Sequence, residues 1–573
     1  MRMTPRTRTV ATLVVVASLA LPVTTATAAA PDVDRLLAAR PYVRLWTEAN
    51  SCRQVSNANS LSGGALDRRL DQLVRWFDHF NSQGSNRFLL GRDCTGSGSS
   101  TLASKLTARG AWVSNYRNGS FTSQSSRSAN LNFYEAANLE RTAPLAIGTF
   151  WPGDWTPYHD GERSSDAARL RGDLSRTSRT VRITAVSAAS RPAGTPGTWP
   201  FIDSRGSGSK AGAFSQNTHD VVSWIRVGAE LMQIVEPPTV ADGVIRLHVR
   251  RGIWRTDARR HGGGSRVFSP VYVGSSSRDA HLSGTPSKND RNVPLRYALK
   301  IWTNAAQRWL IGRIHSTFGS SWQGHNAVWL DTTSCVQYSN ADPYGNQVFG
   351  WDERVDAKFT PERWGAAQRT KVAAVRDAFP RKKVLANNLI NRNACTERLL
   401  ADVDAGAFEH WLKWGSGQDL DWTGSMSQLI DVQRRDWPAM LWVRWDYGSS
   451  VGPAQYRRFT YGSYLLVRRP GARRTMYGGP WDLTRPEELY FWDWGDPRER
   501  ATVLNDLRVA GTPLFRRRYE HGIVLVNPSS SAVAFGLGDT YYDVVNRTTS
   551  GAPRAVTSVT VPARDAVFLL RAR

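Results

Sequence analysis

Two carboxylates in this chain stand where a buried strand is expected to end. Asp331 follows the apolar run Ala327-Val328-Trp329-Leu330, and Glu409 follows Gly406-Ala407-Phe408. Such runs are typical of parallel strands covered on both faces, whose carboxyl ends open into a site. Two carboxyl groups on one rim can divide the roles of nucleophile and proton donor. The plainer alternatives are an Asp that only caps a turn and a Glu held in a salt bridge.

Other polar and aromatic residues near these strand ends are candidates for substrate contacts. Asp446 follows the run 439–445 and can orient a substrate hydroxyl or take over the role of Glu409. The apolar residues around Glu409 are expected to raise its pKa toward the range of a proton donor. The candidate substrate-binding residues are Asp446, Trp411, Trp445, Tyr116, Asn387, Trp351 and Asp352.

Alternating strands and helices position these residues. The first helix has Leu66, Leu70, Leu73, Val74 and Phe77 on one face, at helical spacing. Another helix begins at Thr360-Pro361, a cap followed by proline in the first turn. The sequence therefore predicts an α/β fold, a (β/α)8 TIM barrel. The eight expected strands are residues 42–47, 87–90, 111–116, 327–331, 383–387, 406–409, 439–445 and 474–477.

Two stretches depart from this rhythm. Residues 141–290 are rich in Ser, Thr, Gly and Arg with short β-branched runs, which favours a β-rich domain inserted after the third strand. Residues 513–573 contain closely spaced strands, which favours a small C-terminal β-sandwich. The barrel is accordingly expected in two parts, residues 31–140 and 291–512.

The N-terminus has the pattern of a secretory signal peptide over residues 1–28. Arg2, Arg6 and Arg8 precede an apolar core, and Ala26-Thr27-Ala28 is a small-x-small cleavage site. The apolar core is too short for a stable membrane anchor. The sequence therefore predicts a secreted, extracellular protein without membrane insertion, and a monomer.

The chain is strongly basic, with a net charge of +25. Basic proteins attract anionic polymers, so the substrate can be neutral or anionic. Only nine of the 74 basic residues are Lys, a skew that points to coding bias, and no nucleic-acid fold signature is present. Nucleic acid is therefore not expected as a partner. The 23 Trp and 17 Tyr suit aromatic platforms against sugar faces.

Four cysteines in an exported protein predict two disulfides, with three possible pairings. Each cysteine follows one of the expected strands. If consecutive strands are neighbours in a parallel barrel, each disulfide joins adjacent loops on one rim. We therefore predict Cys52–Cys94 and Cys335–Cys395.

The strand ending at Asp331 resembles the fourth strand of the α-galactosidase-like barrels, although His325-Asn326 replaces their Asp-Gly. The C-terminal part, with Glu520-His521-Gly522 before Val526-Asn527-Pro528-Ser529, resembles the ending of many glycoside hydrolases. The resemblance covers roughly residues 40–140 and 293–573 and identifies a glycoside-hydrolase-like (β/α)8 family. It implies that Asp331 is the nucleophile and Glu409 the general acid/base.

The expected function is therefore cleavage of a polysaccharide or oligosaccharide by two carboxylates, without metal or cofactor. One alternative is a non-catalytic carbohydrate-binding or cell-surface protein that kept the barrel. Another is a phosphodiesterase or metallohydrolase, disfavoured because no His/Asp/Glu cluster has ligand spacing. The sequence does not indicate the sugar or the stereochemical outcome.

Overall fold

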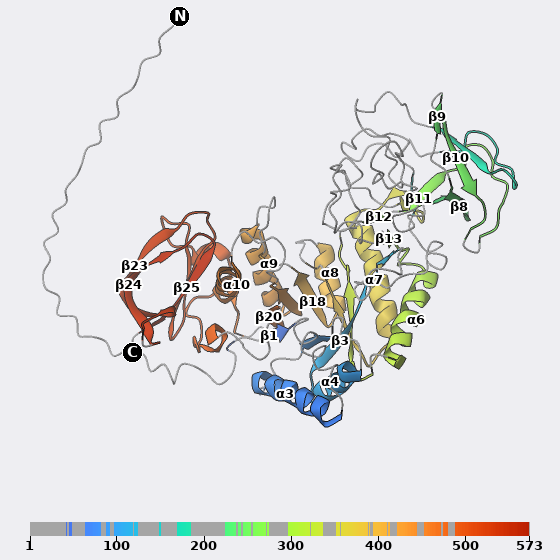
Figure 1. The fold of residues 1–573 in the computed structure, drawn as a ribbon. Coiled ribbons are helices and arrows are strands. Elements are labelled where there is room, and N and C mark those ends of the chain that lie inside the picture. Colours follow the sequence, from blue (N-terminus) through green and yellow to red (C-terminus); the bar gives the residue numbers. More distant parts are fainter. Residues whose placement is uncertain are drawn as a thin grey trace, which may run out of the picture.

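The protein has a mixed α/β structure, represented by a computed structural model (Figure 1). The described residues are 42, 45–47, 63–81, 88–91, 97–118, 120–123, 148–150, 169–184, 224–235, 239–241, 244–253, 256–270, 272–273, 296–320, 323–335, 351–355, 357–387, 389, 394–409, 411–412, 421–443, 452–470, 474–479, 488–549 and 551–571.

Eight parallel strands form a sheet that closes on itself, because the last strand pairs with the first. Each strand lies beside its predecessor in this series, as expected when helices connect parallel strands. The predicted mixed α/β class with a parallel sheet is confirmed. In order around the sheet the strands are β1 (Leu45–Thr47), β2 (Phe88–Gly91), β3 (Trp112–Asn118), β14 (Ala327–Asp331), β17 (Lys383–Ala386), β18 (Ala405–Glu409), β19 (Ala439–Trp442) and β20 (Thr475–Gly479).

Helices alternate with these strands along the chain. The predicted start of α7 is confirmed: Thr360 caps it by accepting from the Arg363 backbone N–H at 3.3 Å, and Pro361 follows. No helix in the described segments is long and apolar enough to cross a membrane. The helices are α3 (Gly63–Asn81), α4 (Ser97–Thr107), α6 (Asn304–Ser320), α7 (Pro361–Ala378), α8 (Ala394–Asp402), α9 (Trp422–Arg434) and α10 (Pro453–Val467).

Between β3 and β14 the chain forms antiparallel sheets. One has the order β5-β11-β7-β8-β10-β6, with β9 paired to β10, and another the order β12-β13-β4. The first has its own buried core, which includes Val181, Ile225 and Leu247. These strands are β4 (Phe121–Ser123), β5 (Gly148–Phe150), β6 (Thr180–Thr184), β7 (Trp224–Val227), β8 (Glu230–Ile234), β9 (Thr239–Ala241), β10 (Val244–Arg250), β11 (Val267–Pro270), β12 (Tyr272–Val273) and β13 (Arg296–Ala298).

The C-terminal part forms one five-stranded antiparallel sheet in the order β21-β22-β25-β23-β24. Its inner side chains, such as Val524 and Phe568, join the core around α10. Ile523 and Leu569, on the opposite face, pack with Val561 in a second cluster. The sheet thus has apolar contacts on both faces without a second sheet in the described residues. Its strands are β21 (Phe515–Arg518), β22 (Gly522–Asn527), β23 (Val533–Arg547), β24 (Pro553–Val561) and β25 (Asp565–Arg571).

Candidate active site

Three neighbouring strands bring Asp331, Asn387 and Glu409 together at their carboxyl ends. β14 pairs with β17 and β17 with β18, all in parallel. Side chains alternate between the two faces of a strand, so residues two apart share a face. The three polar residues therefore continue the series of side chains that fill the inside of the closed sheet. This inner cluster consists of Ala327, Trp329, Leu385, Ala405, Ala407, Met440, Trp442 and Met476.

Asn387 joins the two carboxylates through one amide nitrogen. Its Nδ2 donates to Asp331 Oδ1 at 2.7 Å and to Glu409 Oε2 at 2.6 Å. Because both oxygens are bonded to one nitrogen, they are at most 5.3 Å apart, the sum of the two distances. Only the NH2 end of the amide can donate twice, so these bonds fix the orientation of Asn387. Its buried Oδ1 has no hydrogen-bond partner in the described residues, and such an acceptor is stabilised when a ligand donates to it.

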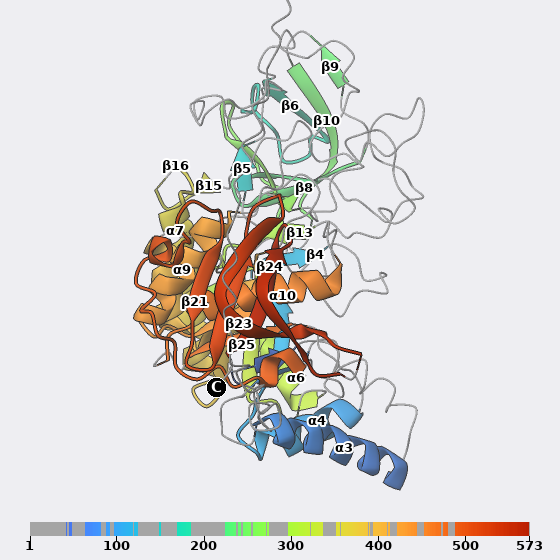
Figure 2. The same ribbon diagram turned by 90° about the vertical axis from the view of Figure 1, so that its left-hand side faces the viewer.

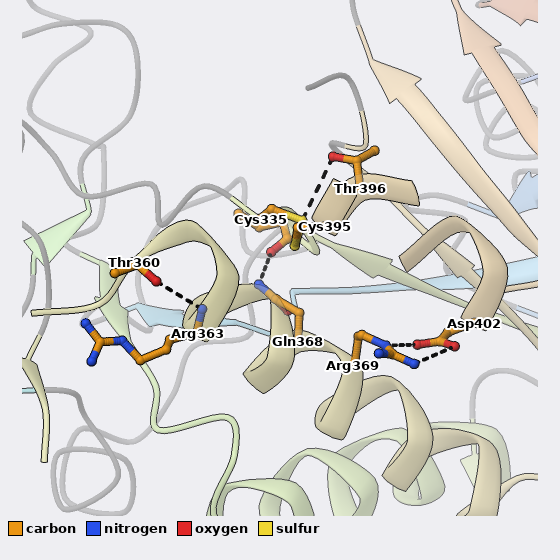
Figure 3. Close-up of a disulfide and its surroundings, with 9 residues drawn as sticks. Cys335, Thr360, Arg363, Gln368, Arg369, Cys395, Thr396 and Asp402 are labelled. Carbon is orange, nitrogen blue, oxygen red and sulfur yellow. Dashed lines mark hydrogen bonds and ion pairs between the residues drawn. A yellow bond between two sulfur atoms is a disulfide. The ribbon is translucent and has the colours of Figure 1, made fainter. Parts of the chain in front are cut away.

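The backbone turns sharply after Asp331. Thr332 has a φ of 54°, a left-handed conformation that is strained for a β-branched residue. Its carbonyl accepts hydrogen bonds from Ser120 Oγ at 2.8 Å and from Gln368 Nε2 at 3.2 Å. Figure 3 shows Gln368 of α7 pointing toward the segment that contains Cys335. Two buried side chains from distant segments thus hold the strained residue next to Asp331.

A lysine lies buried behind the same turn. Lys371 is 1% exposed, and its Nζ donates to Ser120 Oγ at 3.0 Å and to Thr333 Oγ1 at 2.9 Å. No carboxylate among the described residues accepts a hydrogen bond from it. Burial lowers the pKa of Lys371 to about 7, although the negative charge of Asp331 opposes this shift. The charge behind Asp331 therefore changes near neutral pH.

A disulfide fastens the loop that follows Asp331. Cys335 and Cys395 are joined, with their Cα atoms 5.9 Å apart, and this confirms the predicted pair (Figure 3). The bond packs on α7 at Gly365, where a β-carbon would lie 1.8 Å from Cys395 Sγ, so only glycine leaves room. Cys52 and Cys94 lie outside the described residues, and their pairing stays a prediction.

Trp411, expected to contact substrate, is instead buried in the core at 4% exposure. Its backbone N–H donates to the Trp442 carbonyl at 3.0 Å, and its carbonyl accepts from the Tyr456 hydroxyl at 2.9 Å. Trp411 belongs to the same core cluster as Phe408, a burial that strand periodicity does not reveal. A buried indole has no face to offer a sugar, so this assignment is corrected to packing.

Asp352 is also engaged in structure rather than open to substrate. It is fully buried, and Arg354 donates to its two oxygens from Nε and Nη2, each at 2.8 Å. The Arg354 guanidinium in turn lies 4.8 Å from the centre of the Trp302 ring. The pair closes the hairpin of β15 (Trp351–Asp352) and β16 (Ala357–Lys358).

No group of three or more His, Cys, Asp or Glu side chains in the described segments could hold a metal ion.

The remaining predicted contacts are not tested by side-chain positions. Tyr116 is described by its backbone, opposite Trp329 in the sheet, and Trp351 by its backbone, opposite Lys358. Trp445 and Asp446 lie outside the described residues. All four stay predictions.

The sequence interpretation missed Gln368 and Lys371, although the pattern of α7 contains a signal. Both fall on the helical stripe that Trp364, Val372 and Val375 bury. A polar residue on such a stripe must find buried partners. Ser120 is that partner for both, and it lies 251 residues from Lys371 in the sequence.

Residues 320–523 match the family model described as hypothetical glycosyl hydrolase family 15. The match includes Asp331, Asn387, Glu409, Lys371 and the disulfide. The resemblance to a glycoside-hydrolase-like family is therefore confirmed for this part of the chain. No curated protein matches the sequence.

Several solved structures are similar over parts of the chain. The glycoside hydrolase domain of PelA from Pseudomonas aeruginosa is 14% identical, covers 34% of this chain and 66% of its own, and has a TM-score of 0.22. Amy13B from Eubacterium rectale is 10% identical, covers 49% and 65%, and has a TM-score of 0.28. A family GH13_31 enzyme is 11% identical over 83% and 85%, with a TM-score of 0.29. The chain thus spans just under two thirds of the first two proteins. With TM-scores this low, no function is inferred for this protein from these structures.

Proposed function

Starting from the glycoside-hydrolase-like match of residues 320–523, we propose that this protein is a secreted glycoside hydrolase. Asp331 acts as the nucleophile and Glu409 as the general acid/base in cleavage of a polysaccharide or oligosaccharide. The observation that carries the proposal is the single amide of Asn387 bonded to both carboxylates. An amide nitrogen that donates to both carboxylates limits the distance between them.

The separation favours retention of the anomeric configuration. Carboxyl groups of retaining enzymes are about 5–5.5 Å apart, whereas those of inverting enzymes are about 6.5–9.5 Å apart to admit a water. The upper limit of 5.3 Å between Asp331 Oδ1 and Glu409 Oε2 fits the first class.

The first step breaks the bond between the anomeric carbon and the leaving oxygen. An Asp331 oxygen forms a bond to that carbon as Glu409 gives its proton to the leaving oxygen. In the second step Glu409 takes a proton from water. The water oxygen bonds to the anomeric carbon, and Asp331 leaves as a carboxylate. Asn387 holds both acids in place.

The architecture we propose around this site is a (β/α)8 barrel. Residues 31–140 and 291–512 form its two parts, residues 141–290 an inserted β-rich domain and residues 513–573 a C-terminal β-domain. The signal peptide of residues 1–28 directs secretion, and the enzyme acts as a monomer. Tyr116, Trp351, Trp445 and Asp446 are the proposed substrate contacts.

The test uses Asp331→Asn and Glu409→Gln, which nearly preserve side-chain shape. Loss of the proton donor costs about 10²–10⁴ in rate on substrates with poor leaving groups and far less on an activated aryl glycoside. Loss of the nucleophile abolishes turnover of both. NMR of the first-formed anomer checks retention.

Two results would contradict the assignment. If Glu409→Gln leaves polysaccharide cleavage intact while Asp446→Asn abolishes it, the proton donor lies on the seventh strand. If the protein binds polysaccharides but no substrate is turned over, it is a carbohydrate-binding protein on a glycosidase-like fold.

A further inference from the structure

The antiparallel sheet that contains β6 and β10 has three arginines in one row. Arg246 of β10 lies opposite Arg182 of β6 in the register of these strands. Leu170 lies opposite Ile183, so Arg171 is the next residue opposite Arg182, and its backbone N–H donates to the Arg182 carbonyl at 2.8 Å. Figure 2 shows β6 and β10 side by side, on a part of the molecule away from the C-terminal sheet.

The row lies on the solvent side of the sheet. Val181 and Ile183, which flank Arg182 on β6, are fully buried, as is Leu247 beside Arg246. Because side chains alternate along a strand, the arginines point to the opposite face. Arg171, Arg182 and Arg246 are all exposed.

Such a row is unfavourable unless something anionic covers it. Neighbouring strands are about 4.8 Å apart. Like charges directly opposite one another destabilise a pair of strands. None of the three guanidiniums forms an ion pair or hydrogen bond with another described residue. The acids of this region that the structure describes are occupied elsewhere, in the pairs Arg251–Glu230, Arg260–Asp173 and Arg259–Asp257.

We propose that Arg171, Arg182 and Arg246 bind an anionic polysaccharide and so deliver it to the proposed glycosidase. The inference rests on the proposed function for the identity of the polymer as substrate. A polymer with one carboxylate or sulfate on each sugar presents anions in a line, as the row presents cations. The planar guanidinium fork donates two parallel hydrogen bonds to such a group. Arg250, exposed on the same face of β10, extends the surface along the strand.

A polysaccharide fits this face better than a nucleic acid does. Single-stranded nucleic acids are bound by basic grooves with aromatic side chains on which bases stack. The large hydrophobic side chains that are exposed in the described segments are all valines: Val235, Val355, Val503 and Val545. Among the residues that the structure describes, the row therefore offers charge without an aromatic side chain on which bases could stack.

The test compares two triple variants of the full-length secreted protein. Arg171→Gln, Arg182→Gln and Arg246→Gln together remove the row. The matched control, Arg500→Gln, Arg554→Gln and Arg571→Gln, removes the same charge from exposed arginines of the C-terminal part that have no ion pair with a described residue. Binding is measured with polygalacturonate as the anionic probe and dextran as the neutral one, at several salt concentrations.

The row variant is expected to bind polygalacturonate at least tenfold more weakly, with a salt dependence reduced by about two to three in log–log slope. The control should change affinity less than twofold. Turnover of a small neutral aryl glycoside should be unchanged in both. The melting temperature of the row variant should be equal or higher, because the repulsion is gone.

Three results would overturn the proposal. Equal weakening by both triples would show a net-charge effect. Duplex DNA bound as tightly as polygalacturonate, and lost with the row, would show a nucleic-acid surface. If the wild type does not bind polygalacturonate, the three arginines do not form a site for an anionic polysaccharide. Failure of the glycosidase proposal looks different: polygalacturonate still binds through the row, but no glycoside is turned over.

Discussion

Two buried charged side chains of this protein have opposite surroundings. Glu230, in the antiparallel sheet, receives the guanidinium fork of Arg251 at 2.6 and 2.7 Å and contacts His261 Nε2 at 2.8 Å. The backbone N–H groups of Gly252 and Arg259 donate to it as well, at 3.1 and 3.0 Å. Burial alone raises the pKa of Glu230, but the hydrogen bonds from Arg251, Arg259 and His261 outweigh it and hold the pKa below its usual value.

Lys371, behind Asp331, has hydroxyl partners in place of opposite charges. Its pKa is therefore lowered mainly by burial, to about 7. The difference shows how one chain uses buried charge in two ways. A charge with matched partners fixes a local structure, whereas a charge without them can change its protonation state near neutrality, here beside the proposed nucleophile.

The largest expected effect is on pH-dependent stability in Lys371→Met. Between pH 7 and 10.5 the unfolded wild type holds a proton that the folded state lacks, so its free energy of unfolding rises with pH. Below about pH 7 both states are protonated, and the full cost of the buried charge is present. The shift from 10.5 to about 7 corresponds to roughly 5 kcal/mol, which the variant lacks.

Urea unfolding of wild type and Lys371→Met at pH 6 and pH 10 measures this difference. Asp331→Asn serves as a second check, because loss of its negative charge should move the wild-type transition to lower pH. Parallel stability curves for wild type and Lys371→Met would mean that Lys371 keeps an ordinary pKa.

The next effect is expected in Glu230→Gln, which leaves Arg251 buried without its carboxylate. Breaking a buried pair costs about 3–5 kcal/mol. In the wild type, Glu230 adds to the free energy of unfolding above its unfolded pKa, and this contribution is lost as the pH falls through its lower folded pKa. The free energy of unfolding of the variant should not show this fall. Hydrogen exchange of residues 224–270 checks the loss. Unchanged protection would show that the Arg251 pair does not stabilise this sheet.

The smallest of these effects concerns the bridge between the carboxylates. Asn387→Ala should lower kcat/KM about 10²-fold on an aryl glycoside, the effect of a misplaced reacting group. Asn326→Ala is the matched control. Asn326 Oδ1 accepts from Val113 N at 2.8 Å and its Nδ2 donates to the Ala111 carbonyl at 2.8 Å, at the other end of β14. It should lower stability and leave the rate intact. If Asn326→Ala lowers the rate and Asn387→Ala does not, Asn387 is not part of the active site.

Strand ends were predictable from the sequence because burial on both faces leaves a local signature. The strand to Asp331 was predicted with its observed bounds, and that to Glu409 to within one residue. The closely spaced strands expected near the C-terminus were also recognisable, but residues 533–547 form one long strand, β23, whose length the local pattern does not show.

Side-chain direction beyond a strand end left no comparable signature. Trp411 and Asp352 have the residue types of a binding site, yet Trp411 is buried in the core and Asp352 is paired with Arg354. The support behind Asp331 depends on Ser120, whose partners on α7 are some 250 residues away. Such contacts arise from topology, so one sequence by itself does not predict them.

The seam that closes the parallel sheet has a consequence for the order of folding. β1 pairs with β20, and Tyr42 near it accepts a hydrogen bond from Arg468 Nη1 at 2.8 Å across 426 residues of chain. One edge of the first strand therefore stays unpaired until the chain has been synthesised as far as β20, which ends at Gly479. Contacts of such long range slow folding and leave intermediates exposed. Until that pairing forms, the free edge of the first strand can pair with other chains, so folding intermediates need protection at this edge.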